Sequence, residues 1–303
     1  MKKPLTIATR AGALAIAQTE IVACALKKLY PDLKIKITRI TTAGDKDLRT
    51  TLWELKSTGF FTSKLEDALL AGKADLAVHS FKDLPTAERE GLKIAAVCDR
   101  KFPEDCLVAA KPIRSLDQLP KGARVGTSSL RRLVQLKRIR PDLACVPIRG
   151  NVTTRLRKLE QGDFDAIVIA RAGLERLGLG NRIFVVFDPA EFIPAAAQGA
   201  LAVQIRADDT ETKKLVAVLD DVDARITTSA ERAVLSALGC GCHAPAGAFA
   251  KISRDTITIS AFLSNPEGQN FRRSSLSGPA TDSDRLARRL TADILDSPNP
   301  KSV

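Results

Sequence analysis

The sequence predicts an α/β protein in which two similar domains are followed by a small α+β domain. Up to Leu177, strand patterns alternate with amphipathic helix patterns, which favours parallel-rich sheets with covered faces. This rhythm restarts after Arg100, which indicates two similar α/β units in tandem. From Asp220 the order becomes a helix, three alternating strands and a helix, as in an antiparallel sheet with one solvated face.

The two α/β units are defined by their apolar periodicity and their turn residues. In the first unit, a helix that follows the turn at Gly12 ends at Pro31. The predicted elements are strands at 5–9, 34–40, 74–79 and 92–97, and helices at 13–30 and 63–71. In the second unit they are strands at 107–110, 124–126, 143–148 and 166–170, and helices at 115–119, 127–138, 151–160 and 173–177.

The C-terminal part reads as one compact unit. It is predicted to comprise a helix at 223–238, strands at 247–253, 256–263 and 271–276, and a helix at 282–295. Because aromatic residues make up only 4% of the 303 residues, aliphatic side chains must build the cores of all three parts.

Charge and composition limit the classes of partner. The formal net charge is +12, which predicts acidic partners such as nucleic acid, anionic lipid or a polyanionic small molecule. No signal-peptide pattern follows the N-terminal Met1-Lys2-Lys3-Pro4, and no uncharged run is long enough to span a bilayer. The six cysteines follow no disulfide pattern, which favours a reducing compartment. We expect a soluble, cytoplasmic protein.

Arginines gather where predicted strands lead into helices. Arg131 and Arg132 lie in the first turn of their helix, where a cation opposes the helix dipole and free backbone N–H groups already favour an anion. One such arginine is usually a solvated side chain. The same pattern recurs at junctions that carry Arg10, Arg149, Arg155, Arg171 and Arg176. Because ligands of open α/β sheets bind at the carboxyl ends of strands, this recurrence predicts a site for several carboxylates.

Lys82 and Asp83 directly follow a buried strand at the same predicted edge. An ionised Asp83 in a cationic cleft is suited to stabilise positive charge on a substrate and to move protons. The competing interpretation is a capping or turn aspartate before Leu84-Pro85. His79 is interpreted as a packed residue at the end of the strand.

A glycine-rich turn at 238–247 contains two thiols and a histidine, Cys240, Cys242 and His243. Three interpretations stay open from the local sequence: small apolar side chains in a turn, a metal half-site, or a nucleophilic thiol that carries a covalent group. No second cysteine pair accompanies it to complete a metal site. Phosphate-binding loops, the dinucleotide fingerprint and the Gly-x-Ser-x-Gly elbow of serine hydrolases do not occur.

Several motifs resemble one family in order and spacing. They lie at 7–10, 77–85, 125–132, 149–156, 172–178, 197–200 and 241–245. Over nearly its whole length the chain resembles the porphobilinogen deaminases, also called hydroxymethylbilane synthases. The resemblance implies two α/β domains like the halves of a periplasmic binding protein and a C-terminal α+β domain with a three-stranded antiparallel sheet. The implied divisions are 1–98 with 195–218, then 99–194, then 219–303.

The resemblance also implies an activity and a set of site residues. The family is a transferase that adds four porphobilinogen molecules to a dipyrromethane primer, releases ammonia each time, and frees linear hydroxymethylbilane with water for tetrapyrrole biosynthesis. Cys242 would carry the dipyrromethane through a thioether, and Asp83 would be the catalytic acid and base. Cofactor-binding positions would be Lys82, Asp83, Ser128, Ser129, Arg131, Arg132 and Arg155. Substrate carboxylates would be held by Arg10, Arg149, Arg155 and Arg176.

Three positions depart from the family pattern. Gly12 replaces a serine, the segment Lys56-Ser57-Thr58-Gly59 replaces a glycine-rich loop bearing a lysine, and Cys240 replaces a glycine. None of these changes removes Asp83 or Cys242. The resemblance further implies a monomer without metal, nucleic-acid or membrane partners.

Two rival functions remain at this stage. A non-catalytic carboxylate- or anion-binding protein of the same two-domain build would not need Cys242. A nucleic-acid binder would explain the charge, but the arginines converge at strand ends and are not interleaved with aromatic residues.

Overall fold

The computed structural model describes residues 4–42, 62–239 and 245–297. These divide into two compact units. Unit 1 holds the described residues up to 101 together with 199–225, and unit 2 holds 102–198 and those from 226 onward. The predicted three-way domain division stays a prediction. Among the helices of these residues, none has the length and apolarity needed to cross a bilayer.

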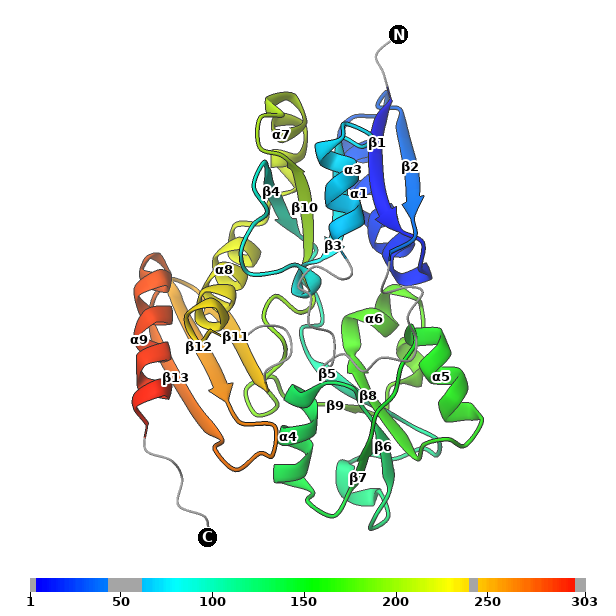
Figure 1. Ribbon diagram of the computed structural model, residues 1–303, viewed down its shortest axis with the longest axis vertical. Helices are drawn as coiled ribbons and strands as arrows, with labels where there is room; N and C mark the ends of the chain where they lie inside the picture. The colour runs from blue at the N-terminus through cyan, green and yellow to red at the C-terminus, as the bar shows by residue number, and fades with distance from the viewer. Residues whose placement is uncertain (1–3, 43–61, 240–244, 298–303) are drawn as a thin grey trace. The chain divides into compact units, whose positions relative to one another are not determined.

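Unit 1 is built on a five-stranded mixed sheet in the order β2-β1-β3-β10-β4 (Figure 1). Its strands are β1 (Leu5–Arg10), β2 (Ile35–Ile40), β3 (Leu76–Ser80), β4 (Leu92–Cys98) and β10 (Leu201–Arg206). Strand β1 runs parallel to β2 and β3, whereas β10 runs antiparallel to both β3 and β4. The carboxyl ends of β1 and β3 therefore lie at one edge of the sheet.

Helices cover both faces of this sheet because the strand residues are apolar on both sides. Ile7 packs in one buried cluster with Val22 and Leu26 of α1 (Ala13–Leu29). Ala8, whose side chain points to the opposite face, packs with Leu65 of α3 (Ser63–Leu70). The remaining elements of the unit are η2 (Phe81–Asp83), α7 (Thr210–Val216) and η5 (Ala217–Leu219).

Unit 2 repeats this sheet in the order β7-β6-β8-β5-β9. Its strands are β5 (Asp105–Ala109), β6 (Arg124–Gly126), β7 (Ala144–Val146), β8 (Ala166–Ala170) and β9 (Val185–Val186). Strand β6 is parallel to β7 and β8, and β5 is antiparallel to β8 and β9. The matching strand orders confirm the predicted pair of similar α/β units.

The expectation of parallel-rich sheets is only half correct. In each sheet one strand, β10 or β5, runs against its two neighbours. Each of these strands is the first one after the chain passes from one unit into the other. A strand entered in this way is not preceded by a crossover helix of its own unit, so the rule that βαβ units are parallel does not apply to it.

The other elements of unit 2 are helical segments around this sheet and a second sheet. The helical segments are η3 (Leu116–Gln118), α4 (Leu130–Ile139), α5 (Val152–Glu160), α6 (Arg171–Arg176) and η4 (Gly180–Arg182). The second sheet is antiparallel, in the order β11 (Ala246–Ser253), β12 (Thr256–Leu263) and β13 (Arg272–Pro279). It packs against α8 (Val222–Ala237) and α9 (Ser283–Asp296) around one apolar core, and η6 (Ala280–Asp282) precedes α9. This arrangement confirms the predicted α+β region.

Strand β11 passes very close to the backbone at Ile193 and Pro194. A Cβ atom added to Gly247 would lie 2.8 Å from the carbonyl oxygen of Pro194 and 2.9 Å from a ring carbon of Phe262. Backbone cannot move aside as a flexible side chain can, so only glycine fits here.

We expect Gly247→Ala to lower the free energy of unfolding by about 1–3 kcal/mol, as other overpacking substitutions do. Urea denaturation of the purified variant measures this. Gly278→Ala in β13 is the matched control, because its Cβ would meet only the side chain of Leu286, at 3.1 Å. Equal loss of stability in both variants would contradict the close backbone approach.

Candidate functional site

In unit 1, the sheet edge at the carboxyl ends of β1 and β3 carries three predicted site residues. Arg10 is the last residue of β1, and Lys82 and Asp83 lie in η2 directly after β3. Phe81 and Leu84 on either side are buried, and the amide of Phe81 donates to the carbonyl of Ala200 at 3.0 Å. These anchors fix a short turn whose two charged side chains stay partly exposed. The turn can therefore offer a carboxylate and an ammonium group to a ligand.

His79 is buried at the end of β3, as predicted, with 5% of its surface exposed. Burial lowers the pKa of His79 to about 4, a hydrogen bond with Gln204 opposes this shift, and the charge of Arg10 adds to it. The imidazole is therefore neutral near pH 7 and is not placed as a cationic ligand.

This buried histidine predicts a pH-dependent loss of stability. Between pH 6.5 and pH 4 the unfolded chain binds a proton that the folded His79 does not, so stability falls as the pH falls. We expect wild type to lose roughly 3 kcal/mol more than His79→Gln over this range, from a shift of about 2.5 pKa units. Urea denaturation at several pH values measures both proteins. Parallel stability curves would contradict the prediction.

In unit 2, β6, β7 and β8 are parallel neighbours, so the loops that follow them lie at one edge of the sheet. Ser128 joins two of these loops. Its hydroxyl donates to the carbonyl of Ile148 at 2.6 Å and accepts from the amide of Ile148 at 2.9 Å. Asn151 caps α5, with its side chain accepting from the amide of Thr154 at 2.9 Å. Ser129 caps the start of α4 without a side-chain hydrogen bond.

Arg131 and Arg132 are buried, each 6% exposed, although their place at a helix start predicts contacts with a ligand. Both pair with Asp105 at the start of β5, which is fully buried. Burial by itself would raise the pKa of Asp105, but the charges and hydrogen bonds of Arg131 and Arg132 hold it well below its ordinary value. The carboxylate also compensates the cost of placing two cations in the first turn of a helix.

Arg155 is different, because the charges that act on it are those of other arginines. Burial, together with repulsion by the charges of Arg132 and Arg149, lowers the pKa of Arg155 to about 10. No carboxylate of the described residues forms an ion pair with Arg155, and its Nε donates to the carbonyl of Gly150 at 2.8 Å. A ligand carboxylate would relieve this repulsion. The cluster of Arg132, Arg149 and Arg155 thus fits a group with several carboxylates.

The remaining junction, after β8, holds Arg171 and Arg176 in α6. Arg171 is engaged by Glu175 at 3.0 Å and by Glu104 at 3.8 Å, and its guanidinium lies over the ring of Phe102. Arg176, at the end of α6, is partly exposed. The role of Arg176 in binding substrate carboxylates stays a prediction.

Some predicted features lie outside the described residues. These are the thiols Cys240 and Cys242 with His243, and the segment that contains Lys56 and Thr58. In the parts of the chain that are described, no three His, Cys, Asp or Glu side chains gather as a metal site would require. Gly12, the third departure from the family pattern, precedes α1, and a Cβ atom there would meet nothing within 4 Å.

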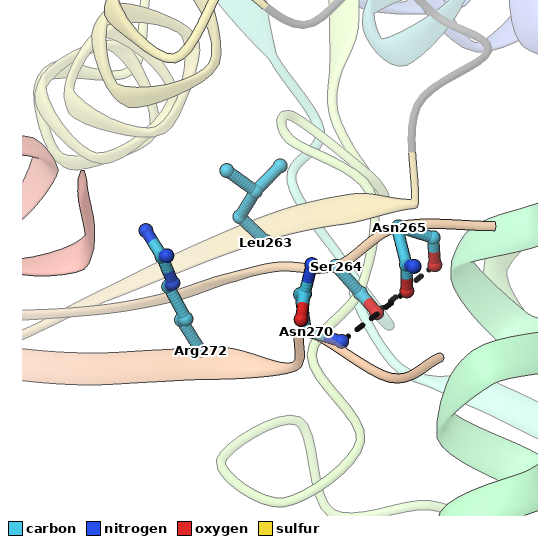
Figure 2. Close-up of a pocket in the computed structure, with 5 residues that line it drawn as sticks. All are labelled: Leu263, Ser264, Asn265, Asn270 and Arg272. Carbon is cyan, nitrogen blue, oxygen red and sulfur yellow. Dashed lines mark hydrogen bonds between the residues drawn. The ribbon is translucent and has the colours of Figure 1, made fainter. Parts of the chain in front are cut away.

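One pocket has none of the predicted site residues among its described lining residues. It is lined by Leu263, Ser264, Asn265, Asn270 and Arg272, at the turn between β12 and β13 (Figure 2). The side-chain oxygen of Asn265 accepts hydrogen bonds from two backbone amides of its own loop. Nη1 of Arg272 donates a hydrogen bond to the carbonyl of Leu295 at 2.8 Å. The side chains of Asn265 and Arg272 therefore stabilise the loop and the end of α9. We assign no ligand to this pocket.

Comparison with known protein families identifies the arginine-rich part of the chain. Residues 5–214 match the family described as "Porphobilinogen deaminase, dipyromethane cofactor binding domain", and residues 225–296 match "Porphobilinogen deaminase, C-terminal domain". The chain belongs to the porphobilinogen deaminase family. The predicted resemblance is thereby confirmed, and the dipyrromethane cofactor is confirmed at the level of the family.

Relatives named porphobilinogen deaminase match over almost their whole length. The chain is 45% identical to the protein of Chromobacterium violaceum over 292 residues, which cover 96% of this chain and 94% of the relative. It is 46% identical to the protein of Roseiflexus sp. (strain RS-1) over 296 residues, which cover 98% of this chain and 97% of the relative.

Solved structures are also similar to parts of the chain. One is the periplasmic aliphatic sulphonate binding protein SsuA from Escherichia coli, at 19% identity and a TM-score of 0.41, covering 78% of this chain and 70% of that one. Another is a nutrient binding protein from Burkholderia cenocepacia bound to methionine, at 16% identity and a TM-score of 0.45, covering 73% and 93%.

Sequence reasoning missed two residues of the site in unit 2. Asp105 and Gln198 are both buried, and the side-chain amide of Gln198 donates to Asp105 at 2.9 Å. Gln198 lies within a family motif at 197–200, but no local pattern marks Asp105, since one aspartate before a strand is ordinary. Its role follows only from partners that lie 26, 27 and 93 residues away in the sequence.

Proposed function

We propose that this chain joins four porphobilinogen molecules head to tail on a covalently held dipyrromethane and releases linear hydroxymethylbilane. The observation that carries the proposal is the family match over residues 5–214. That range contains Asp83 and every arginine of the predicted site. In each of the four additions the aminomethyl C–N bond breaks, ammonia leaves and a C–C bond forms with loss of a proton, and one water releases the product.

The dipyrromethane, when bound, supplies the pyrrole carbon to which the first substrate is joined. We propose that Cys242 carries it, because a thiolate is a suitable nucleophile for the electrophile that remains when ammonia leaves. In that attachment the C–N bond of an aminomethyl group breaks, a C–S bond forms, and the thiol proton ends on the leaving ammonia.

The residues of unit 1 fit the chemistry of ammonia loss. Asp83 is held by buried neighbours in a fixed turn, partly exposed, with the cation Lys82 next to it. The carboxyl group of Asp83, when protonated, can give its proton to the leaving amine, and the carboxylate that results can stabilise the positive charge that develops on the substrate. Arg10, at the same edge of the sheet, can bind a carboxylate of that substrate.

The residues of unit 2 fit the charge of the growing chain. Each pyrrole unit carries two carboxylates, so the product held by the enzyme is a polyanion. We propose that Arg149, Arg155 and Arg176 bind these carboxylates, and that Ser128, Ser129, Arg131 and Arg132 build the cofactor side of the site. The repulsion among Arg132, Arg149 and Arg155 supports this proposal.

We propose the partner and the compartment on the basis of the same function. The substrate is the small molecule porphobilinogen, and we propose that the net charge of +12 attracts its carboxylates and does not serve to bind the phosphates of nucleic acid or lipid. We propose a cytoplasmic monomer. Light scattering of the eluting peak in gel filtration tests the monomer directly.

Intact mass of the purified, denatured wild type tests the proposal together with turnover. We expect a mass above the sequence mass by two porphobilinogen-derived pyrroles, and release of ammonia and hydroxymethylbilane when porphobilinogen is added. A bare sequence mass that stays unchanged after incubation with porphobilinogen, without ammonia release, would overturn the proposal and favour the anion-binding alternative.

A further inference from the structure

Asp105 is the acceptor at the centre of a buried hydrogen-bond network in unit 2. Its Oδ2 accepts from Nη1 of Arg131 at 2.7 Å. Its Oδ1 accepts from Nε and Nη2 of Arg132 at 3.1 and 2.8 Å and from the side-chain amide of Gln198 at 2.9 Å. A carboxylate that is fully buried and accepts four hydrogen bonds is held in one orientation.

The two guanidinium groups are also oriented from their other sides. Nη1 of Arg131 donates to the carbonyl of Ile193 at 2.8 Å, and Nη1 of Arg132 donates to the carbonyl of Val168 at 3.0 Å. Gln135, one turn further along α4, exchanges two hydrogen bonds with the backbone of Ile193. The first turn of α4 is therefore fixed to β5, to β8 and to the segment before β10.

Neither arginine uses all its donors in this network. A guanidinium carries five N–H groups. Within the described part of the chain, these contacts engage two of those of Arg131 and three of those of Arg132. The other N–H groups of both arginines take no part in this network, and Arg132 is near enough to Arg155 for its charge to act there. Asp105 thus sets where the remaining donors of both arginines can point.

We propose that Asp105 is a positioning residue for cofactor assembly, which holds Arg131 and Arg132 so that their remaining N–H groups meet carboxylates of the dipyrromethane. This inference rests on the proposed function. Asp105 itself does not contact the ligand in this proposal, and it acts only through the two arginines. A role in the fold alone would lower the folded fraction of a variant and leave the loading rate of its folded molecules unchanged.

Two substitutions of Asp105 separate the effect of the position of its carboxylate from the effect of its negative charge. Asp105→Glu keeps the charge but moves the carboxylate by one methylene, and Asp105→Asn keeps the shape but removes the charge. Asp142→Asn is the matched control. Asp142 is likewise held by two nitrogens of one arginine, Arg140, at 2.8 and 2.7 Å, and is not among the predicted site residues.

Each protein is prepared without bound pyrroles and incubated with porphobilinogen, and intact mass follows the loaded fraction with time. Circular dichroism and thermal melting give the folded fraction of the same samples. We expect folded Asp105→Glu to load slower by on the order of 100-fold, which is typical of a misplacement of about 1 Å. Asp142→Asn is expected to load as wild type does.

The loading rates of the folded variants decide whether Asp105 has a positioning role. Wild-type rates in both folded variants would overturn the positioning role, and so would loading that falls only in proportion to the folded fraction. If Asp105→Asn does not fold, Asp105→Glu alone decides. Failure of wild type to load would instead reject the proposed function itself.

Discussion

Cys242→Ser is expected to purify with the bare sequence mass and to form no hydroxymethylbilane. A hydroxyl is a much weaker nucleophile than a thiolate at neutral pH, so the C–S bond that anchors the dipyrromethane cannot form and no primer is retained. Intact mass before and after incubation with porphobilinogen measures the anchor, and absorbance of the oxidised product measures turnover.

The neighbouring thiol supplies the control for this variant. Cys240→Ser makes the same sulfur-to-oxygen change two residues before Cys242. This variant is expected to keep the added mass and most of the turnover. If the added mass persisted in Cys242→Ser and vanished in Cys240→Ser, the anchor would be Cys240. Loss in both variants would indicate that attachment of the dipyrromethane needs both thiols.

Asp83→Asn is expected to lower the turnover number by about 10²–10⁴-fold, the range typical of general acid–base catalysis. The amide keeps the size of the side chain and leaves Phe81 and Leu84 packed, so the thermal unfolding midpoint should stay close to that of wild type. It cannot give a proton to the leaving amine, and it does not stabilise a cation. Single-turnover release of ammonia measures the affected step.

Asp67→Asn is the control for a carboxylate of the same unit. Asp67 lies on α3, 62% exposed at its side chain, in an ion pair with Arg89 at 2.7 Å. Its loss should leave turnover unchanged, since exposed pairs contribute little. Turnover of Asp83→Asn at the wild-type rate would reject the acid–base role of Asp83.

Local patterns were sufficient to predict most elements of the fold. Alternation and capping residues place β1, α5 and β12 within a residue or two of their observed bounds, because these elements are set by periodicity and by the cap at Asn151. Strand β10 was missed, because its residues 201–206 continue an apolar stretch that begins at Phe192. Its antiparallel direction depends on the path of the chain between the units, which no local pattern contains.

The arginine-rich site shows the same limit. The sequence identifies Arg131 and Arg132 as cations in an unfavourable place, and this is correct. It does not reveal that Asp105 compensates them, because the pairing is formed between β5 and α4 in the folded chain only. Arg155 and its repulsion by Arg132 and Arg149 match the predicted carboxylate site more directly.

The placement of β10 has a consequence for synthesis on the ribosome. Strand β10 lies between β3 and β4, so the sheet of unit 1 lacks an inner strand until residue 206 has emerged. The five-stranded sheet of unit 2 uses only residues 105–186 and is complete earlier. The middle of the polypeptide can therefore fold first, while the nascent N-terminal segment waits with the edges of β3 and β4 unpaired. A chain terminated before residue 201 would expose those edges permanently and would be prone to aggregate.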